Sequence, residues 1–228
     1  MVPMNAQRQV GAAVTDAFLD RHPVFSRSMF AEAHGEHRPS PPLVKRLKYL
    51  QSTGRVVSVE RELYATVRPG QDPVTVAPDP YLVGLALRPD GVFAYHSALT
   101  LLGAGHSDWS VVTLLSSRRR RPLELRNARV EILPHPVALV RNDATELGVG
   151  SLGYLHTTLR VTSRERTLVD GFRQVRLVGG LEELVTSAAG FASLDFDLLA
   201  AVLEAYDLRI LFAAGGWFLE TYREHLFV

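Results

Sequence analysis

The most informative polar side chains of this sequence recur at helical spacing between residues 45 and 52. Placed about 100° apart around a helix, four of them share one face, while Leu43, Leu47 and Leu50 share the opposite face. The four are Lys45, Lys48, Tyr49 and Ser52. Lysines offer positive charge to phosphates or to guanine edges, and hydroxyls offer hydrogen bonds. This face therefore predicts contact with nucleic acid, although a solvated lysine face is the common alternative.

Further candidates for phosphate contact lie around this helix. Ser26 and Arg27 fall at the start of a short helix, where backbone amides favour an anion. Ser40 is a candidate N-cap with Pro41 at the first helical position. The remaining candidates are Arg46, Arg55 and Arg61.

A run of four arginines lies at the edge of, or in the turn between, the strands expected at 110–116 and 129–133, with Arg126 and Arg129 close behind. Its members are Arg118, Arg119, Arg120 and Arg121. Two interpretations stay open: a solvated turn, or a second phosphate-contacting patch that lengthens a DNA footprint and adds to its salt dependence.

No set of residues predicts catalysis. His96 beside Ser97 suggests a general base, but the sequence shows no acid to orient it, so a buried histidine satisfied by the backbone is favoured. The histidines show no metal-ligand spacing, and there is no glycine-rich phosphate loop. The glycine pairs 179–180 and 215–216 are expected at helix boundaries. We expect neither an enzyme nor a cofactor.

The elements that must position the candidate face form a recognisable order. Apolar spacing predicts helices over about 5–19, just after 25–27, and from 41 to Gly54, which fits a C-terminal cap. Two β-rich runs, 55–59 and 63–67, flank a polar turn and predict a hairpin. Three helices followed by a hairpin are typical of a winged helix-turn-helix.

The rest of the chain predicts a second domain. A proline-bearing linker over 69–78 separates domain 1–68 from domain 79–228. The second domain is expected to contain strands at 110–116, 129–133 and 159–162 and helices at 80–87, 94–102, 163–175, 181–188, 195–206 and 216–225. Ser163 is the expected cap of the helix at 163–175, whose charged residues are interpreted as ties to the sheet rather than as a partner surface. The expected fold class is α/β (α+β): a winged helix-turn-helix, then an α/β domain with a short mixed sheet and a helical C-terminal part.

Composition and charge set the remaining limits. The 228 residues are 46% apolar and 21% charged, as in globular proteins. No cysteine is present, so disulfides, thiol nucleophiles and cysteine-ligated zinc are excluded. Neither a membrane-spanning run nor a signal peptide is predicted, which favours a cytoplasmic protein. Residues 1–68 carry ten basic and six acidic residues, whereas 180–228 carry two and eight, so the ends are expected to face different partners.

Several motifs in order resemble the AbiEi family, the antitoxins of type IV toxin–antitoxin systems. They are Val24-Phe25-Ser26-Arg27 through 54–64, Asp79-Pro80-Tyr81-Leu82-Val83, Tyr95-His96-Ser97-Ala98-Leu99 with Leu102-Gly103, the stretch 161–170 (VTSRERTLVD), and 179–183 (GGLEE). The resemblance covers about residues 24–220. Glu60-Arg61-Glu62 departs from it by making the hairpin tip less basic than expected.

The resemblance implies a two-domain antitoxin and transcriptional autorepressor. Its winged domain would bind operator repeats in double-stranded DNA, and its second domain would counteract a nucleotidyltransferase-like toxin without needing a stable complex. A dimer or cooperative assembly on DNA is compatible with repeated operators. Three alternatives stay open: a stand-alone winged-helix transcriptional regulator, a DNA-targeted nuclease, and a protein-interaction scaffold.

Overall fold

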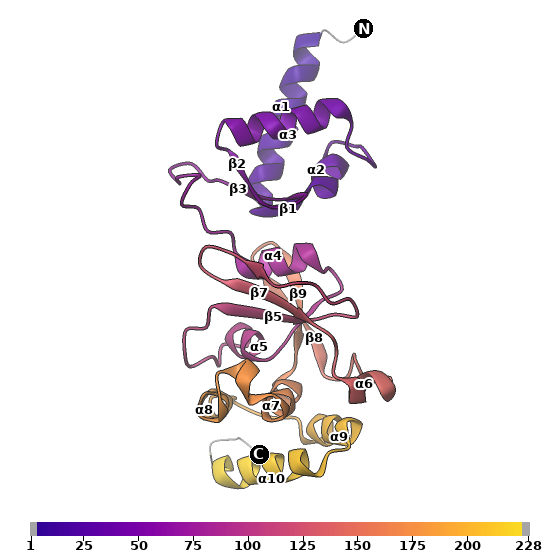
Figure 1. Ribbon diagram of the computed structural model, residues 1–228, viewed down its shortest axis with the longest axis vertical. Helices are drawn as coiled ribbons and strands as arrows, with labels where there is room; N and C mark the ends of the chain where they lie inside the picture. Colours follow the sequence, from indigo (N-terminus) through magenta and orange to yellow (C-terminus); the bar gives the residue numbers. More distant parts are fainter. Residues whose placement is uncertain (1–3, 225–228) are drawn as a thin grey trace. The chain divides into compact units, whose positions relative to one another are not determined.

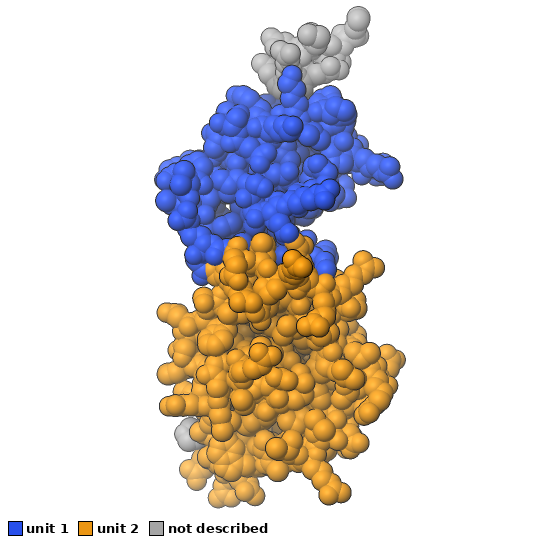
Figure 2. Space-filling view, viewed as in Figure 1, with its two compact units in different colours: residues 1–89, 125–127 blue, residues 90–124, 128–228 orange. Residues whose placement is uncertain are grey.

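A computed structural model describes residues 4–224, in two compact units (Figure 2). The first comprises residues 1–89 and 125–127, and the second comprises 90–124 and 128–228. The first unit thus includes the helix over 80–87, which the sequence analysis placed after the linker. In all, the chain is α+β with two separate sheets, in agreement with the expected class.

The first unit is built from four helices and a small antiparallel sheet (Figure 1). In chain order its elements are α1 (Met4–Arg21), β1 (Val24–Ser26), α2 (Arg27–Ala33), α3 (Pro41–Ser52), β2 (Val56–Glu60), β3 (Leu63–Thr66) and α4 (Pro80–Leu87). The strand order is β1-β3-β2. The three helices and the hairpin predicted in residues 1–68 are confirmed as elements. Strand β1 was not predicted, because three residues carry no readable alternation.

Aromatic side chains from three elements form the core of the first unit. The rings of Phe25 on β1 and Phe30 on α2 meet that of Phe18 on α1 edge-on, with centroids 5.1 and 5.4 Å apart. The apolar side of α3 packs into the same cluster through Leu47 and Leu50. This core fixes α3 with its opposite side turned outward.

The second unit is a six-stranded mixed sheet with a helical C-terminal part (Figure 1). Its strands are β4 (Val92–Phe93), β5 (Val111–Leu115), β6 (Leu123–Glu124), β7 (Arg129–Leu133), β8 (Val149–Tyr154) and β9 (Thr157–Thr162), in the order β6-β7-β5-β4-β9-β8. The pairs β5–β7 and β4–β9 are parallel and the other pairs are antiparallel. The expected mixed sheet is confirmed, although β4, β6 and β8 were not predicted.

The helices of this unit pack around α7, except α6, which contacts α9. They are α5 (His96–Leu101), α6 (Val137–Arg141), α7 (Arg164–Arg173), the 3-10 helix η1 (Val175–Val178), α8 (Leu181–Ala189), α9 (Phe196–Tyr206) and α10 (Arg209–Tyr222). Helix α7 contacts α5, α8, α9 and α10. Two predictions for the last helix were wrong. It begins at Arg209 rather than 216, and Gly215 and Gly216 lie inside it, because Leu211, Gly215 and Phe218 give it a continuous buried face. The end predicted at residue 225 lies outside the described residues.

Candidate nucleic-acid interface

Helix α3 presents two different faces, as its spacing predicted. Leu47 and Leu50 are each only 2% exposed, whereas Tyr49 is 64% exposed. Lys45, Lys48 and Ser52 are also exposed. The structure therefore brings Lys45, Lys48, Tyr49 and Ser52 together on one outward surface, which we call the α3 face. Its chemistry is that of two mobile positive charges with two hydroxyl groups beside them.

The start of α3 is held differently from the expectation. Ser40 occupies the N-cap position, but its side chain makes no cap hydrogen bond. Its hydroxyl and its backbone N–H instead donate to the two carboxylate oxygens of Glu36, each at 2.7 Å. These hydrogen bonds lower the pKa of Glu36. Ser40 thus fastens the loop before α3, and Pro41 supplies the helical backbone angle at the first turn.

Two of the candidate arginines are already paired with acids. The guanidinium of Arg27 forms an ion pair with the Glu62 carboxylate at the hairpin tip. The backbone N–H of Arg27 also donates to the backbone carbonyl of Glu62 at 2.9 Å. The Arg55 guanidinium lies 2.7 Å from a carboxylate oxygen of Asp16 on α1. Both ion pairs are partly exposed, so each contributes little to folding stability. A DNA phosphate that took the place of the carboxylate would therefore break only a weak interaction. Sequence reasoning missed these acids because they lie far from their partners along the chain.

The other candidates of the first unit occupy separate places. Ser26 caps α2, accepting a hydrogen bond from the Met29 N–H at 3.2 Å, as predicted. Arg61 is exposed at the hairpin turn. Arg46 is half-buried and does not belong to the α3 face, because its guanidinium lies beside Gly11 of α1.

The arginine run lies in the second unit, in the loop between β5 and β6. Arg118, Arg119 and Arg121 are exposed and Arg120 is half-buried. The Arg118 N–H donates to the Ser116 hydroxyl at 3.3 Å, which anchors the start of the loop. The predicted position between two strands is confirmed, while the choice between solvated turn and phosphate patch stays open.

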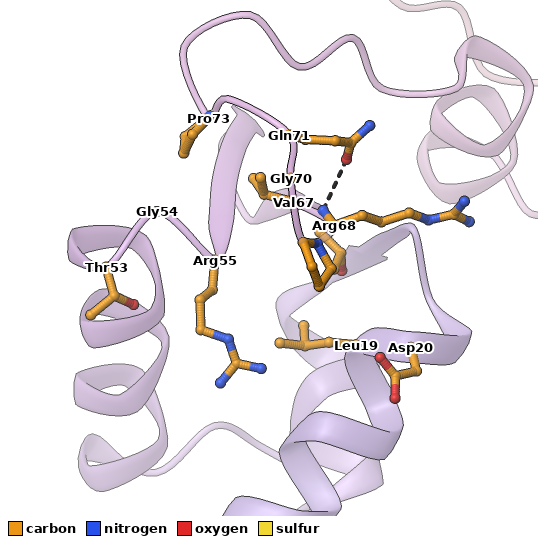
Figure 3. A pocket seen from close by; sticks show the side chains of 12 residues that line it. Leu19, Asp20, Thr53, Gly54, Arg55, Val67, Arg68, Gly70, Gln71 and Pro73 are labelled. Carbon is orange, nitrogen blue, oxygen red and sulfur yellow. Dashed lines mark hydrogen bonds between the residues drawn. The ribbon is translucent and has the colours of Figure 1, made fainter.

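A hollow of about 690 Å³ lies in the first unit, between the ends of α1 and α3 and the loop after β3. The side chains of Leu19 and Arg55 extend toward each other inside it (Figure 3). The Arg68 N–H donates to the side chain of Gln71 at 2.9 Å and fixes the far wall. We assign no ligand to this hollow.

His96 has an acidic partner that the sequence did not reveal. It is 1% exposed, its Nε2 lies 3.2 Å from Glu183 on α8, and its ring stacks on Trp109. The Ser97 hydroxyl is not a partner of His96: it accepts a hydrogen bond from the backbone N–H of Thr113 at 2.7 Å. Glu183 in turn accepts hydrogen bonds from Ser107, Ser187 and the N–H of residue 106. The expectation of a buried histidine is confirmed, and the side chains of Glu183 and Thr100 lie within hydrogen-bond distance of its two ring nitrogens.

A second buried network joins α7 to its neighbours. Arg166 and Asp170 are fully buried, with 3.0 Å between Nε and the carboxylate. Arg166 also donates to the Leu147 carbonyl at 2.7 Å, and the Tyr206 hydroxyl donates to Asp170. Ser163 caps α7 by accepting from the Arg166 N–H, as predicted. These contacts tie α7 to the loop before β8 and to α9, rather than to the sheet as expected, and they give Arg166 and Asp170 a structural role.

Nearby, Tyr95 takes a left-handed backbone conformation, with φ of 58°. Its hydroxyl accepts from Arg173 at 2.8 Å. Burial, with the charge of Asp170, raises the pKa of Tyr95 to about 12, so its hydroxyl stays protonated.

Among residues 4–224, no three His, Asp or Glu side chains gather as metal ligands, and no helix is long and apolar enough to cross a membrane.

Comparison with known proteins adds a fold relationship. No protein-family model matches the chain, and no curated protein matches it. Among solved structures it is similar to the RV2827C protein from Mycobacterium tuberculosis, with a TM-score of 0.55 and 19% sequence identity. The match covers 100% of this chain and 83% of that chain. At this identity the likeness shows a shared fold alone.

Proposed function

We propose that this protein is a DNA-binding antitoxin and autorepressor of the AbiEi type, whose first unit is a winged helix-turn-helix. The observation that carries the proposal is the α3 face, in which Lys45, Lys48, Tyr49 and Ser52 are exposed together. A helix enters the major groove of B-DNA when its outward side carries groups that pair with base edges and phosphates.

The order of elements supports α3 as the recognition helix. The first unit runs α1, β1, α2, α3 and then the β2–β3 hairpin, and β1 closes the small sheet against β3. In a winged helix-turn-helix the third helix reads the groove, the second helix meets the backbone with its N-terminus, and the hairpin forms the wing. Ser26 and Arg27 then stand at the start of the second helix, and Arg61 at the wing tip.

The antitoxin part of the proposal rests on the sequence motifs that resemble the AbiEi family. The most recognisable of them, 161–170, forms the start and body of α7, around which most helices of the second unit pack. We assign the antitoxin activity to this unit and the DNA-binding activity to the first. We propose that the protein acts by binding.

Two measurements test the proposal. The first is titration of the full chain with duplex DNA from upstream of its own coding sequence and with a scrambled duplex of equal length. We expect specific sites to bind at least about a thousandfold more tightly than scrambled DNA. The second is co-expression of the chain with a nucleotidyltransferase-like toxin, taken from the neighbouring reading frame where that frame encodes one; the chain should restore the growth that the toxin inhibits. Specific DNA binding without any rescue would instead support a stand-alone transcriptional regulator.

A further inference from the structure

The last helix carries an exposed apolar face that nothing in the described chain covers. Helix α10 buries Leu211, Gly215 and Phe218, while Ile210 is 74% exposed and Trp217 is 46% exposed. Large apolar side chains grouped on one exposed face mark an interaction surface. The helix forms the outer edge of the second unit, with α7 on its inner side (Figure 1).

Gly216, on this exposed face, is not explained by packing within the chain. A glycine inside a helix costs about 1 kcal/mol relative to alanine. A side chain at Gly215 would meet Leu203 of α9, but a Cβ at Gly216 would have no atom of another described segment within 4 Å. A small residue with open space above it suits the close approach of a second helix.

The exposed residues of α10 are arranged almost symmetrically along the helix. At about 100° per residue, Ile210 and Trp217 lie on one side of the face, and Arg209 and Glu220 lie on the other. Ala213 lies between the two sides. Both pairs have their midpoints between residues 213 and 215. A face of this kind is complementary to itself when a second copy runs antiparallel.

We propose that the outer face of α10 pairs with α10 of a second copy of this chain, antiparallel about a two-fold axis near Ala213. Under this symmetry a residue meets the one at the mirrored height on the same side of the partner helix. Arg209 then forms an ion pair with the partner's Glu220, and Ile210 packs on the partner's Trp217. Ala213 and Gly216 let the backbones approach.

The area available sets the expected strength. One face of a 14-residue helix buries less than the ~800 Å² per partner of a standard interface, so the dimer is weak in free solution. The dimer carries two copies of the first unit. On a repeated operator, binding of one copy holds the second copy near its own repeat, which raises the overall affinity for DNA. The pairing does not depend on DNA binding, so it is tested without DNA.

Sedimentation equilibrium of the full chain tests the pairing through a charge exchange. We expect a reversible monomer–dimer equilibrium below about 200 µM, since weak interfaces dissociate in the micromolar range. Arg209→Glu and Glu220→Arg should each weaken it at least tenfold, because each places like charges together. The double variant R209E/E220R should regain the wild-type constant. Glu204→Arg, an exposed change on α9, is the matched control.

Two further variants separate the interface from folding. Gly216→Leu should strengthen the helix yet abolish the dimer, because leucine favours helices but prevents close approach. Ala213→Cys supplies the only thiol of the chain, and oxidation should link it to the same position of the second copy, whereas Glu204→Cys should stay monomeric. A wild-type chain that is monomeric throughout this range, or a double variant that is as monomeric as the single variants, would overturn the proposal.

Discussion

At the scale of single residues, buried charge is concentrated on α7. Arg166 and Asp170 are 0% exposed and bound to each other, and neither meets water. A charge pair of this kind adds little net stability, but loss of one partner leaves the other charge buried and uncompensated. The pair therefore makes the position of α7 sensitive to single substitutions.

Asp170→Asn should lower the free energy of unfolding by about 3–5 kcal/mol, because the Arg166 guanidinium keeps its charge without a counter-ion. Tyr206→Phe is the comparison: it removes one hydrogen bond to the same carboxylate but keeps the ion pair, so it should cost less, about 1–3 kcal/mol. Urea unfolding of both variants gives the comparison. Equal losses would show that the hydrogen bond, rather than the ion pair, matters.

The Glu183 network predicts a loss of stability in acid. Burial opposes the charge of Glu183, but hydrogen bonds from Ser107, Ser187 and the residue 106 N–H outweigh it and lower the pKa to about 2. Burial also lowers the pKa of His96. Both groups bind protons more readily when unfolded, so their contribution is complete at neutral pH and falls with acidification.

The decline should begin as the pH falls below 6.5, the ordinary value for histidine, and steepen between 4.5 and 2 as Glu183 is protonated. Unfolding free energy measured against pH checks this, with Glu183→Gln as the comparison. That variant should be less stable at pH 7 but lose less on acidification. If wild type and Glu183→Gln had the same dependence of unfolding free energy on pH, protonation of Glu183 would not be the cause of the acid instability.

At the scale of elements, the loop between β5 and β6 carries the run of four arginines, Arg118–Arg121. Its arginines lie outside the sheet core, and the positive charge of such a loop acts over about 8 Å at physiological salt. If the loop contacts phosphate, replacing Arg118–Arg121 by serines should weaken duplex binding, most at low salt, with unchanged base preference.

Titrations at two salt concentrations against operator and scrambled duplexes measure this effect. Arg141→Ser with Arg223→Ser, two exposed arginines elsewhere in the same unit, is the control for general charge. Melting curves of all variants ensure that the serine substitutions leave the unit folded. Unchanged affinity at both salt concentrations would identify the run as a solvated turn.

The elements also show how far sequence patterns reach. Helix α3 was predicted because the spacing of its leucines agrees with its tertiary packing. Strands β4 and β6 have two residues each and carry no pattern of their own, so only pairing with neighbours creates them. The start of helix α10 was placed too late because Gly215 and Gly216 suggested a helix boundary, whereas buried Leu211 and Phe218 continue the helix through them.

The candidate site shows the same division. The α3 face could be predicted, since four positions on one helix follow from its period alone. The partners of Arg27 and Arg55, and the acid beside His96, could not, because each lies on another element distant in sequence. Arg46 was included by proximity in sequence, although the helix turns it toward α1.

At the scale of the whole molecule, the proposal assigns one activity to each compact unit. Residues 1–89 contain every element of the first sheet as well as α4, which contacts β1. A fragment of residues 1–89 should therefore bind operator DNA, and a fragment of 90–228 should rescue growth from the toxin without repressing the operon. Circular dichroism first establishes that each fragment folds. Rescue by residues 1–89 alone would reverse the assignment.

The α3 face is the surface on which the proposed DNA binding depends, and the salt dependence of DNA binding tests its role. Lys45→Ala with Lys48→Ala should lower operator affinity and leave the fold intact, because both side chains point away from the core. The slope of log K against log salt should shrink by about 0.9 for each phosphate that the variant no longer neutralises. Arg141→Ala, which removes a charge from the second unit, should leave the slope unchanged. Unchanged affinity and an unchanged slope in the double lysine variant would show that the α3 face does not contact DNA.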